Sequence, residues 1–197
     1  PAYGLNTAAL NRPDLQPHPT RSLAMTRLAH GLLEVDDPPV KALMIWAANP
    51  MISNPDQDRV RQGLERDDLF TVVVDHVHTA TTAYADIVLP GTVQTEHDDM
   101  HDSFSHLYLN WNNAAVAPAG VSLSHTEIFR RLAHAMGLDE PALYESDDEL
   151  AEALLDSDHA SVAGINLADL KRTGWARLGG TSPYVPFVDG LPTQSKK

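Results

Sequence analysis

The chain has 197 residues, of which 43% are hydrophobic and 21% charged, with 14 Lys and Arg against 27 Asp and Glu. The net charge of −13 argues against nucleic-acid binding, because it would repel a phosphate backbone. No apolar run approaches the roughly 20 residues that a membrane-spanning helix needs. The sequence has no cysteine, which excludes a disulfide framework, a thiolate nucleophile and a cysteine-ligated iron–sulfur cluster within these residues.

The N-terminal part is rich in proline. Residues 1–19 are expected to form an extended segment, because closely spaced prolines disfavour regular structure. A helix is expected to follow from Thr20, whose hydroxyl can cap the first turn, to about Glu34. Ala24 and Leu28 belong to the apolar stripe that this helix would bury.

Two uninterrupted apolar runs, 42–48 and 70–74, are the most regular feature of the sequence. Because apolar and polar residues do not alternate in them, they predict parallel strands that are buried on both faces. Between the runs, Asn54 as N-cap and Pro55 at the first helical position predict a helix. A helical turn and a third strand over 86–90 follow. The order predicts an α/β fold: a three-layer, open, mostly parallel sheet with flanking helices, Rossmann-like, with irregular N- and C-terminal extensions.

After the third strand, a polar, histidine-rich loop leads to a predicted strand over 107–111. A capping box at 124–127 begins a predicted helix that ends at Gly137, and a second box at 146–149 begins a helix that ends near Leu155. The remainder has many glycines and prolines and is expected to be loop. The sequence is thus expected to divide into an extended segment (1–19), an α/β domain (20–160) and a loop-rich C-terminal linker (161–197).

Polar residues follow the predicted strands where a ligand would bind. In an open parallel sheet the ligand crevice lies beyond the carboxyl ends of the strands, where Asn49, Asp75 and the turn at Pro90 and Gly91 fall. Asp75 could accept two hydrogen bonds from a ribose diol or a guanine edge, and Asn49 could both donate and accept. The alternative is that these residues only cap or turn the chain. A G-x-G-x-x-G fingerprint is absent from the first loop, so a standard NAD site is not indicated.

A second candidate is a cluster of acidic residues and histidines after the third strand. Imidazole and carboxylate are ligands for divalent metals, so the cluster raises the alternative of a metal-dependent hydrolase. None of its spacings matches a defined metal signature, and a solvated acidic loop or a loop packed on a partner domain explains it as well. The residues concerned are Glu96, His97, Asp98, Asp99, His101 and His106.

Other features do not indicate a catalytic centre. Without a G-x-S-x-G elbow or a cysteine, the sequence gives little support to nucleophilic catalysis. Trp46 and Trp111 lie within predicted strands and are expected to pack rather than to stack on a cofactor. Met44 and Met136 are assigned to the core for the same reason.

Taken together, several short motifs resemble the molybdopterin oxidoreductase family, which includes dimethyl sulfoxide reductase, formate dehydrogenase and biotin sulfoxide reductase. Their order and spacing, rather than any single motif, make the resemblance specific, and it covers nearly the whole chain. The motifs lie at 47–50, 68–75, 79–83, 85–90 and 96–99, with further similarity at 59–64, in the helix over 124–137 and at 193–197.

The resemblance implies that the chain matches the family's third domain, a dinucleotide-binding-like fold that holds the nucleotide part of one pterin. The implied cofactor is bis-molybdopterin guanine dinucleotide with molybdenum or tungsten, with an iron–sulfur cluster in a region preceding this chain. His97 stands where some relatives have lysine, and His125 where relatives have an acidic or amide residue. No catalytic or metal-ligating residue is implied here, and the implied cofactor-binding residues are Asn49, Pro50, Val74, Asp75, Thr79, Thr81, His97 and His125.

The resemblance further implies that the full enzyme acts on formate or a small S- or N-oxide, in contact with an electron-transfer partner. The other implied partners are a small-molecule substrate and the remaining domains of the same polypeptide. The isolated fragment is expected to be inactive, and the cytoplasm is the expected location. Two alternatives remain: a non-catalytic nucleotide-binding α/β module, and the metal-dependent hydrolase.

Overall fold

The two apolar runs form neighbouring parallel strands in the computed structural model, which describes residues 4–15, 18–103, 106–179, 187, 190–191 and 193–195. The described residues belong to two compact units. The parallel-sheet unit comprises 14–97 and 114–144, and the antiparallel-sheet unit comprises the described residues within 1–13, 98–113 and 145–197. The domain boundaries expected at residues 19 and 160 stay a prediction.

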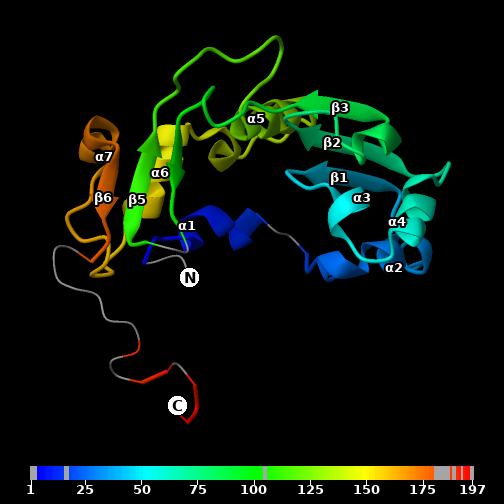
Figure 1. The fold of residues 1–197 in the computed structure, drawn as a ribbon, viewed down its shortest axis with the longest axis horizontal. Coiled ribbons are helices and arrows are strands. Elements are labelled where there is room, and N and C mark those ends of the chain that lie inside the picture. Colours follow the sequence, from blue (N-terminus) through cyan, green and yellow to red (C-terminus); the bar gives the residue numbers. More distant parts are fainter. Residues whose placement is uncertain are drawn as a thin grey trace. The chain divides into compact units, whose positions relative to one another are not determined.

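The parallel-sheet unit contains three strands in the order β1-β2-β3, namely β1 (Ala42–Trp46), β2 (Phe70–Asp75) and β3 (Ile87–Pro90) (Figure 1). All neighbours are parallel, so their carboxyl ends share one edge of the sheet. The α/β fold predicted from the sequence is thereby confirmed.

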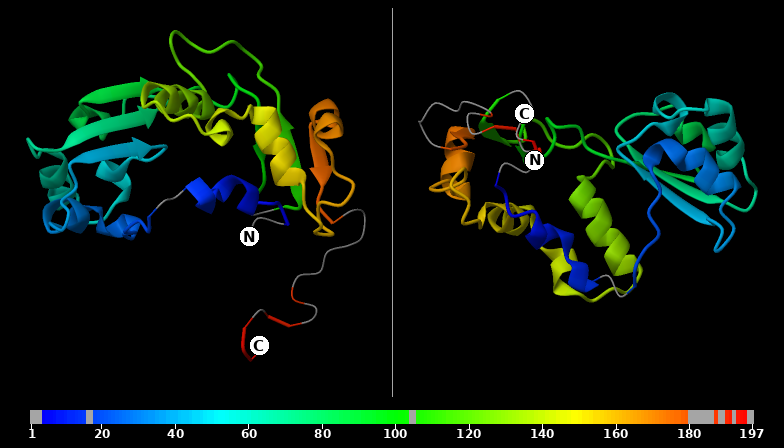
Figure 2. Two further views of the ribbon diagram at one scale, coloured as in Figure 1. Left: turned by 180° about the vertical axis from the view of Figure 1, so that it is seen from behind. Right: turned by 90° about the horizontal axis from the view of Figure 1, so that it is seen from below.

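Two helices cover one face of this sheet. Helices α2 (Leu28–Leu33) and α4 (Gln57–Leu64) lie side by side (Figures 1 and 2). A Cβ on Gly63 would lie 2.8 Å from the Leu32 Cβ, so glycine permits the close approach of the two helices. Ile45, Val60 and Val73 belong to the same buried cluster, which forms the core of this unit.

The opposite face of the sheet is only partly covered within the described part of this unit: Val74 on this face is fully buried. Met44 and Trp46 alternate with the buried Ile45 along β1, and Trp46 is 51% exposed. Phe70 and Ile87 are also exposed. The prediction that both faces are buried, with Met44 in the core, is therefore wrong over part of this face, whereas Trp46 packs edge to face on Phe129, as predicted for a packing residue. Burial of each face depends on which distant segments cover it, and α2 and α4 cover only one.

The helices begin at other residues than the sequence suggested. Thr20 caps no helix, and α2 follows a short 3₁₀ helix, Met25–Arg27. Asn54 is not the cap of α4, which begins after Asp56. The Asn54 side chain is buried and donates to the Met25 carbonyl at 2.9 Å, which explains why it is unavailable as a cap. A further short helix, α3 (Pro50–Ser53), starts directly after Asn49.

The amino ends of β1 and β2 are joined by charged groups. Lys41 precedes β1, Asp68 precedes β2, and the two side chains form an ion pair. Arg66 donates to Asp68 through Nε at 2.9 Å. Hydrogen bonds from Arg66 and then Lys41 lower the pKa of the Asp68 carboxyl well below its usual range. These contacts secure the edge of the sheet opposite to the strands' carboxyl ends.

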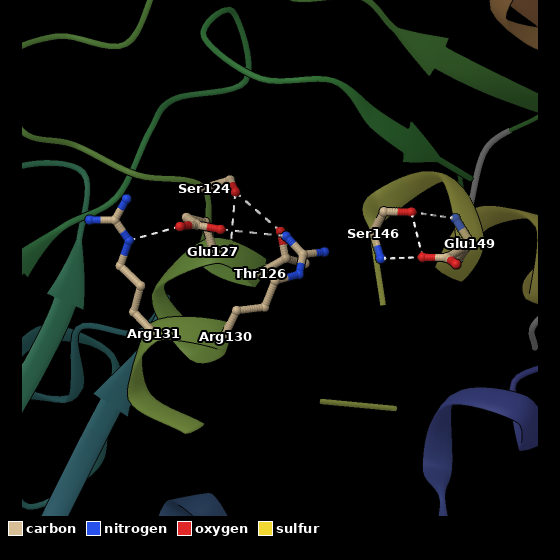
Figure 3. Close-up of polar contacts among 7 residues, drawn as sticks. All are labelled: Ser124, Thr126, Glu127, Arg130, Arg131, Ser146 and Glu149. Carbon is tan, nitrogen blue, oxygen red and sulfur yellow. Dashed lines mark hydrogen bonds and ion pairs between the residues drawn. The ribbon is translucent and has the colours of Figure 1, made fainter. Parts of the chain in front are cut away.

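Helix α5 (His125–Ala135) belongs to the parallel-sheet unit and has half of its predicted capping box. The Ser124 Oγ accepts from the Glu127 N–H at 3.3 Å (Figure 3). The Glu127 carboxylate accepts from Arg131 Nε at 2.7 Å. The sequence pattern predicts the Ser124 bond but not the competition of arginine for Glu127. Met136, expected in the core, is 63% exposed just after this helix.

The antiparallel-sheet unit has strands in the order β4-β5-β6 and three helices. Trp111 is buried in its core with Leu109 and Leu170, as expected for this tryptophan. The Lys171 ammonium lies 4.8 Å from the centre of the Trp111 ring. The elements are β4 (Asp99–His101), β5 (Tyr108–Asn112), β6 (Trp175–Arg177), α1 (Ala8–Asn11), α6 (Asp147–Leu155) and α7 (Leu167–Thr173).

Helix α6 has the complete predicted box: the Ser146 N–H donates to Glu149 Oε2 at 2.7 Å, and the Glu149 N–H donates to Ser146 Oγ at 3.2 Å (Figure 3). The expectation of loop from 161 onward is wrong for the described residues up to 179, which include α7 and β6. Asn166 caps α7 by accepting from the Asp169 N–H at 2.9 Å. Residues 180–186 of the predicted linker and 196–197 of the final motif lie outside the described residues. No helix among the residues described is long and apolar enough to span a bilayer.

Candidate functional site

The candidate site lies in the parallel-sheet unit, at the edge formed by the carboxyl ends of its strands. Asn49 follows β1, Asp75 ends β2 and Gly91 follows β3. Because β1 pairs with β2 and β2 with β3 in parallel, the three positions share this edge. The sequence prediction located the edge through the polar residues that end the apolar runs.

Asn49 is held by a threonine from a distant loop. The Thr81 side chain is fully buried, and its hydroxyl donates to Asn49 Oδ1 at 2.7 Å. The Met51 N–H donates to Thr81 Oγ1 at 3.2 Å. Pro50 is buried at the first position of α3. The structure thus brings two predicted site residues, Asn49 and Thr81, into direct contact.

Asp75 leaves part of its carboxylate available. Its Oδ1 accepts from the His76 N–H at 2.8 Å, and its carbonyl accepts from the Gly91 N–H at 3.0 Å. Its Oδ2 has no hydrogen-bond partner among the described residues, and the side chain is half-buried. Asp75 therefore offers a negatively charged acceptor at the sheet edge.

Val74 and Thr79 flank the Asp75 position in the sequence. Val74 is fully buried, and its carbonyl accepts from the Ala47 N–H at 3.2 Å, where the chain leaves β1. The Thr79 N–H donates to Thr82 Oγ1 at 3.0 Å. The Thr79 hydroxyl is buried and has no hydrogen-bond partner within the described chain. A buried unpaired hydroxyl is costly, so this group is suited to a polar ligand atom.

Aromatic rings form a cluster at the same edge. The His76 and His125 rings stack at 5.4 Å and 26°, and the Trp46 and His125 rings meet edge to face at 5.6 Å. A Cβ on Gly91 would lie 2.8 Å from His125 Nε2, so the glycine leaves room for the histidine pair. Sequence reasoning named His125 but missed His76 as a site residue and assigned Trp46 to packing. The signal for His76 was its place directly after Asp75.

Gly91→Ala is expected to displace the stacked histidines, because the new methyl group would overlap the His125 ring. The imidazole NMR signals of His76 and His125 should shift. The matched control is Gly31→Ala, whose Cβ would meet only the flexible Leu23 Cδ1 at 2.8 Å. Unchanged imidazole signals in Gly91→Ala would contradict the close packing at this edge.

His97 is held by the segment after β3. Thr92 is buried, and its Oγ1 lies 2.8 Å from His97 Nδ1. The Thr92 N–H donates to the Leu123 carbonyl at 3.0 Å, next to the start of α5. His97 and His125 are therefore held by segments that pair with each other through Leu123 and Gly91.

The acidic cluster does not form a metal centre in the described residues. Glu96 accepts from the N–H groups of Val93 and Ala119, both at 3.0 Å, and so braces a loop. Asp99 accepts from the Met100 N–H at 2.8 Å, and His106 packs edge to face on Tyr108. No group of three or more His, Asp or Glu in the part of the chain described could hold a metal ion. The hydrolase alternative therefore has no geometric support there.

Comparison with known proteins decides the family. The family model described as "Molybdopterin oxidoreductase" matches residues 22–135, more than half of the chain. The chain belongs to the molybdopterin oxidoreductase family. The resemblance predicted from the sequence is confirmed, and membership implies a molybdopterin cofactor with molybdenum or tungsten.

Relatives within this family share both sequence and fold. "Probable oxidoreductase YoaE" of Bacillus subtilis is 42% identical over 98% of this chain and 28% of its own length. "F420-dependent formate dehydrogenase 1 subunit alpha" of Methanococcus maripaludis is 30% identical over 58% of this chain and 17% of its own length. A structure of acetylene hydratase from Pelobacter acetylenicus matches with a TM-score of 0.64 and 26% identity, over 88% of this chain and 23% of that one. The chain thus spans about a quarter of the length of YoaE and of the hydratase.

Proposed function

We propose that this chain holds the guanine nucleotide part of one molybdopterin guanine dinucleotide in a molybdenum or tungsten oxidoreductase. The observation that carries the proposal is the half-buried Asp75 carboxylate, whose Oδ2 has no partner among the described residues at the carboxyl edge of the parallel sheet. Guanine presents two neighbouring N–H donors on its Watson–Crick edge, and a carboxylate can accept from both. Family membership supports the pterin part of this proposed ligand, and the Asp75 carboxylate supports guanine as its base.

The other groups at this edge fit a nucleotide. Asn49 offers an amide and Thr79 a buried unpaired hydroxyl, both suited to ribose or phosphate oxygens. The histidines His76 and His125 offer ring nitrogens and aromatic surface, and Gly91 leaves room for them. His97, Pro50, Val74 and Thr81 complete the set of residues proposed to line or support the nucleotide.

When bound, such a cofactor supplies the redox chemistry of its metal, and the protein supplies binding and orientation. The proposed role of this chain is to bind and orient the nucleotide end. None of its residues is proposed as a metal ligand or as a catalytic group, and the chain alone is proposed to lack activity.

For the whole protein we propose a bis-molybdopterin guanine dinucleotide enzyme that acts on formate or a small S- or N-oxide. Relatives named as formate dehydrogenase and as biotin sulfoxide reductase support this substrate range. The iron–sulfur cluster, the electron-transfer partner, the contacts with further domains of the same polypeptide and the cytoplasmic location belong to the same proposal.

Guanine recognition is tested by calorimetric titration of the 197-residue chain with guanosine and adenosine diphosphates. We expect guanosine diphosphate to bind at least about tenfold more tightly, because adenine offers Asp75 an acceptor nitrogen in place of the guanine N1–H. Equal affinities would contradict a guanine site.

A second measurement separates the enzyme from the non-catalytic module. In a longer protein that contains this chain, we expect molybdenum or tungsten near stoichiometry and about two guanine nucleotides per chain. Guanine nucleotide without either metal would overturn the enzyme proposal and favour the module.

A further inference from the structure

The Thr81 hydroxyl is buried and has two hydrogen-bond partners, a backbone N–H and the Asn49 amide. The Met51 backbone N–H can only donate, and it donates to Thr81 Oγ1 at 3.2 Å. The hydroxyl hydrogen therefore needs an acceptor elsewhere. Within the described chain, its acceptor is Asn49 Oδ1 at 2.7 Å.

This network determines which end of the Asn49 amide faces Thr81. With the amide reversed, Nδ2 would face the hydroxyl, and the hydroxyl hydrogen would be left without an acceptor in a fully buried position. Unsatisfied buried donors are penalised, so the orientation with Oδ1 toward Thr81 is favoured. The bond joins residues 32 positions apart.

The other end of the amide is left for a ligand. Asn49 is half-buried, and Nδ2 has no acceptor among the residues that the structure describes. With the oxygen turned toward Thr81, the amide presents its NH2 group to a ligand, and this group can only donate to acceptor atoms. At the same sheet edge Asp75 recognises only donors, so the two positions have opposite hydrogen-bonding character.

We propose that Thr81 is a positioning residue that turns the Asn49 NH2 group toward the ligand, where it donates to an acceptor oxygen such as a phosphate oxygen of a nucleoside diphosphate. Thr81 thus acts on the ligand through Asn49 rather than by contact. The ligand class rests on the proposed function, whereas the orientation of Asn49 does not.

The test compares Thr81→Val, which keeps the shape but removes the hydroxyl, with Thr81→Ser, which keeps the hydroxyl. The matched control is Thr71→Val, because the Thr71 hydroxyl is equally buried in the same unit but has no hydrogen-bond partner among the described residues. Each variant of the 197-residue chain is examined by NMR of the Asn49 side-chain amide and by titration with guanosine diphosphate.

Without ligand, we expect Thr81→Val to shift the Asn49 amide signals and to increase amide motion, while Thr81→Ser and Thr71→Val retain the wild-type signals. With guanosine diphosphate, we expect roughly tenfold weaker binding for Thr81→Val, restored by serine. Wild-type amide signals in Thr81→Val would overturn the positioning role. A different outcome is that the amide signals respond as expected while neither the wild type nor any variant binds guanosine diphosphate. That result would overturn the proposed function and the ligand class but would leave the orientation of the Asn49 amide supported.

Discussion

Asp75→Asn is expected to turn a site that prefers guanine into one that prefers xanthine. The carboxylate accepts from both guanine donors, whereas an amide can accept one hydrogen bond and donate another. Xanthine carries a carbonyl oxygen where guanine carries its exocyclic amino group, so it matches the amide better. We expect guanosine diphosphate to bind roughly 100-fold more weakly, from about 3 kcal/mol of lost charge-assisted hydrogen bonding.

The measurement is a titration of wild type and variant with guanosine and xanthosine diphosphates. Asp58→Asn is the matched control, since Asp58 is an exposed carboxylate on α4 that pairs with Arg61 at 3.0 Å. It removes the same charge and should leave both affinities unchanged. Equal weakening of both ligands by Asp75→Asn, without a change of preference, would argue that Asp75 stabilises the loop rather than reads the base.

The position of this edge could be predicted from the sequence because it depends on local patterns. Asn49 and Asp75 end uninterrupted apolar runs, and parallel strands align such ends. Ser124 and Ser146 likewise cap their helices as predicted, because capping involves residues only three positions apart.

The packing around the edge could not be predicted, because it depends on contacts between distant segments. Thr81 reaches Asn49 across 32 positions, and His125 on α5 stacks on His76, which directly follows β2. Apolar runs also do not say which segment covers each face of a sheet, so Met44 was assigned to the core although its side chain is exposed. The acidic cluster was ambiguous for the same reason: its spacing does not reveal that Glu96 binds backbone N–H groups.

The two faces of the sheet differ in how well they can accommodate a charged side chain, and this difference is expected to affect stability more than any single contact at the edge. Val73 on β2 is fully buried against α2 and α4, whereas Ile87 on β3 is 44% exposed. The register pairs Ile87 with Val72, so its side chain points to the opposite face from Val73. An aspartate at position 73 would bury a carboxylate among apolar side chains, but at position 87 it could remain hydrated.

Val73→Asp is therefore expected to destabilise the parallel-sheet unit by more than about 4 kcal/mol, because a carboxylate buried without a partner is among the costliest single changes. Ile87→Asp, the matched control, should cost about 1 kcal/mol or less. Urea unfolding followed by the amide NMR signals of β1 and β2 measures both. Since typical domains are stable by only about 5–15 kcal/mol, Val73→Asp should approach loss of the folded unit, and with it the alignment of Asn49 and Asp75. Equal unfolding midpoints for the two variants would contradict the assignment of position 73 to the buried core and of position 87 to an exposed part of the other face.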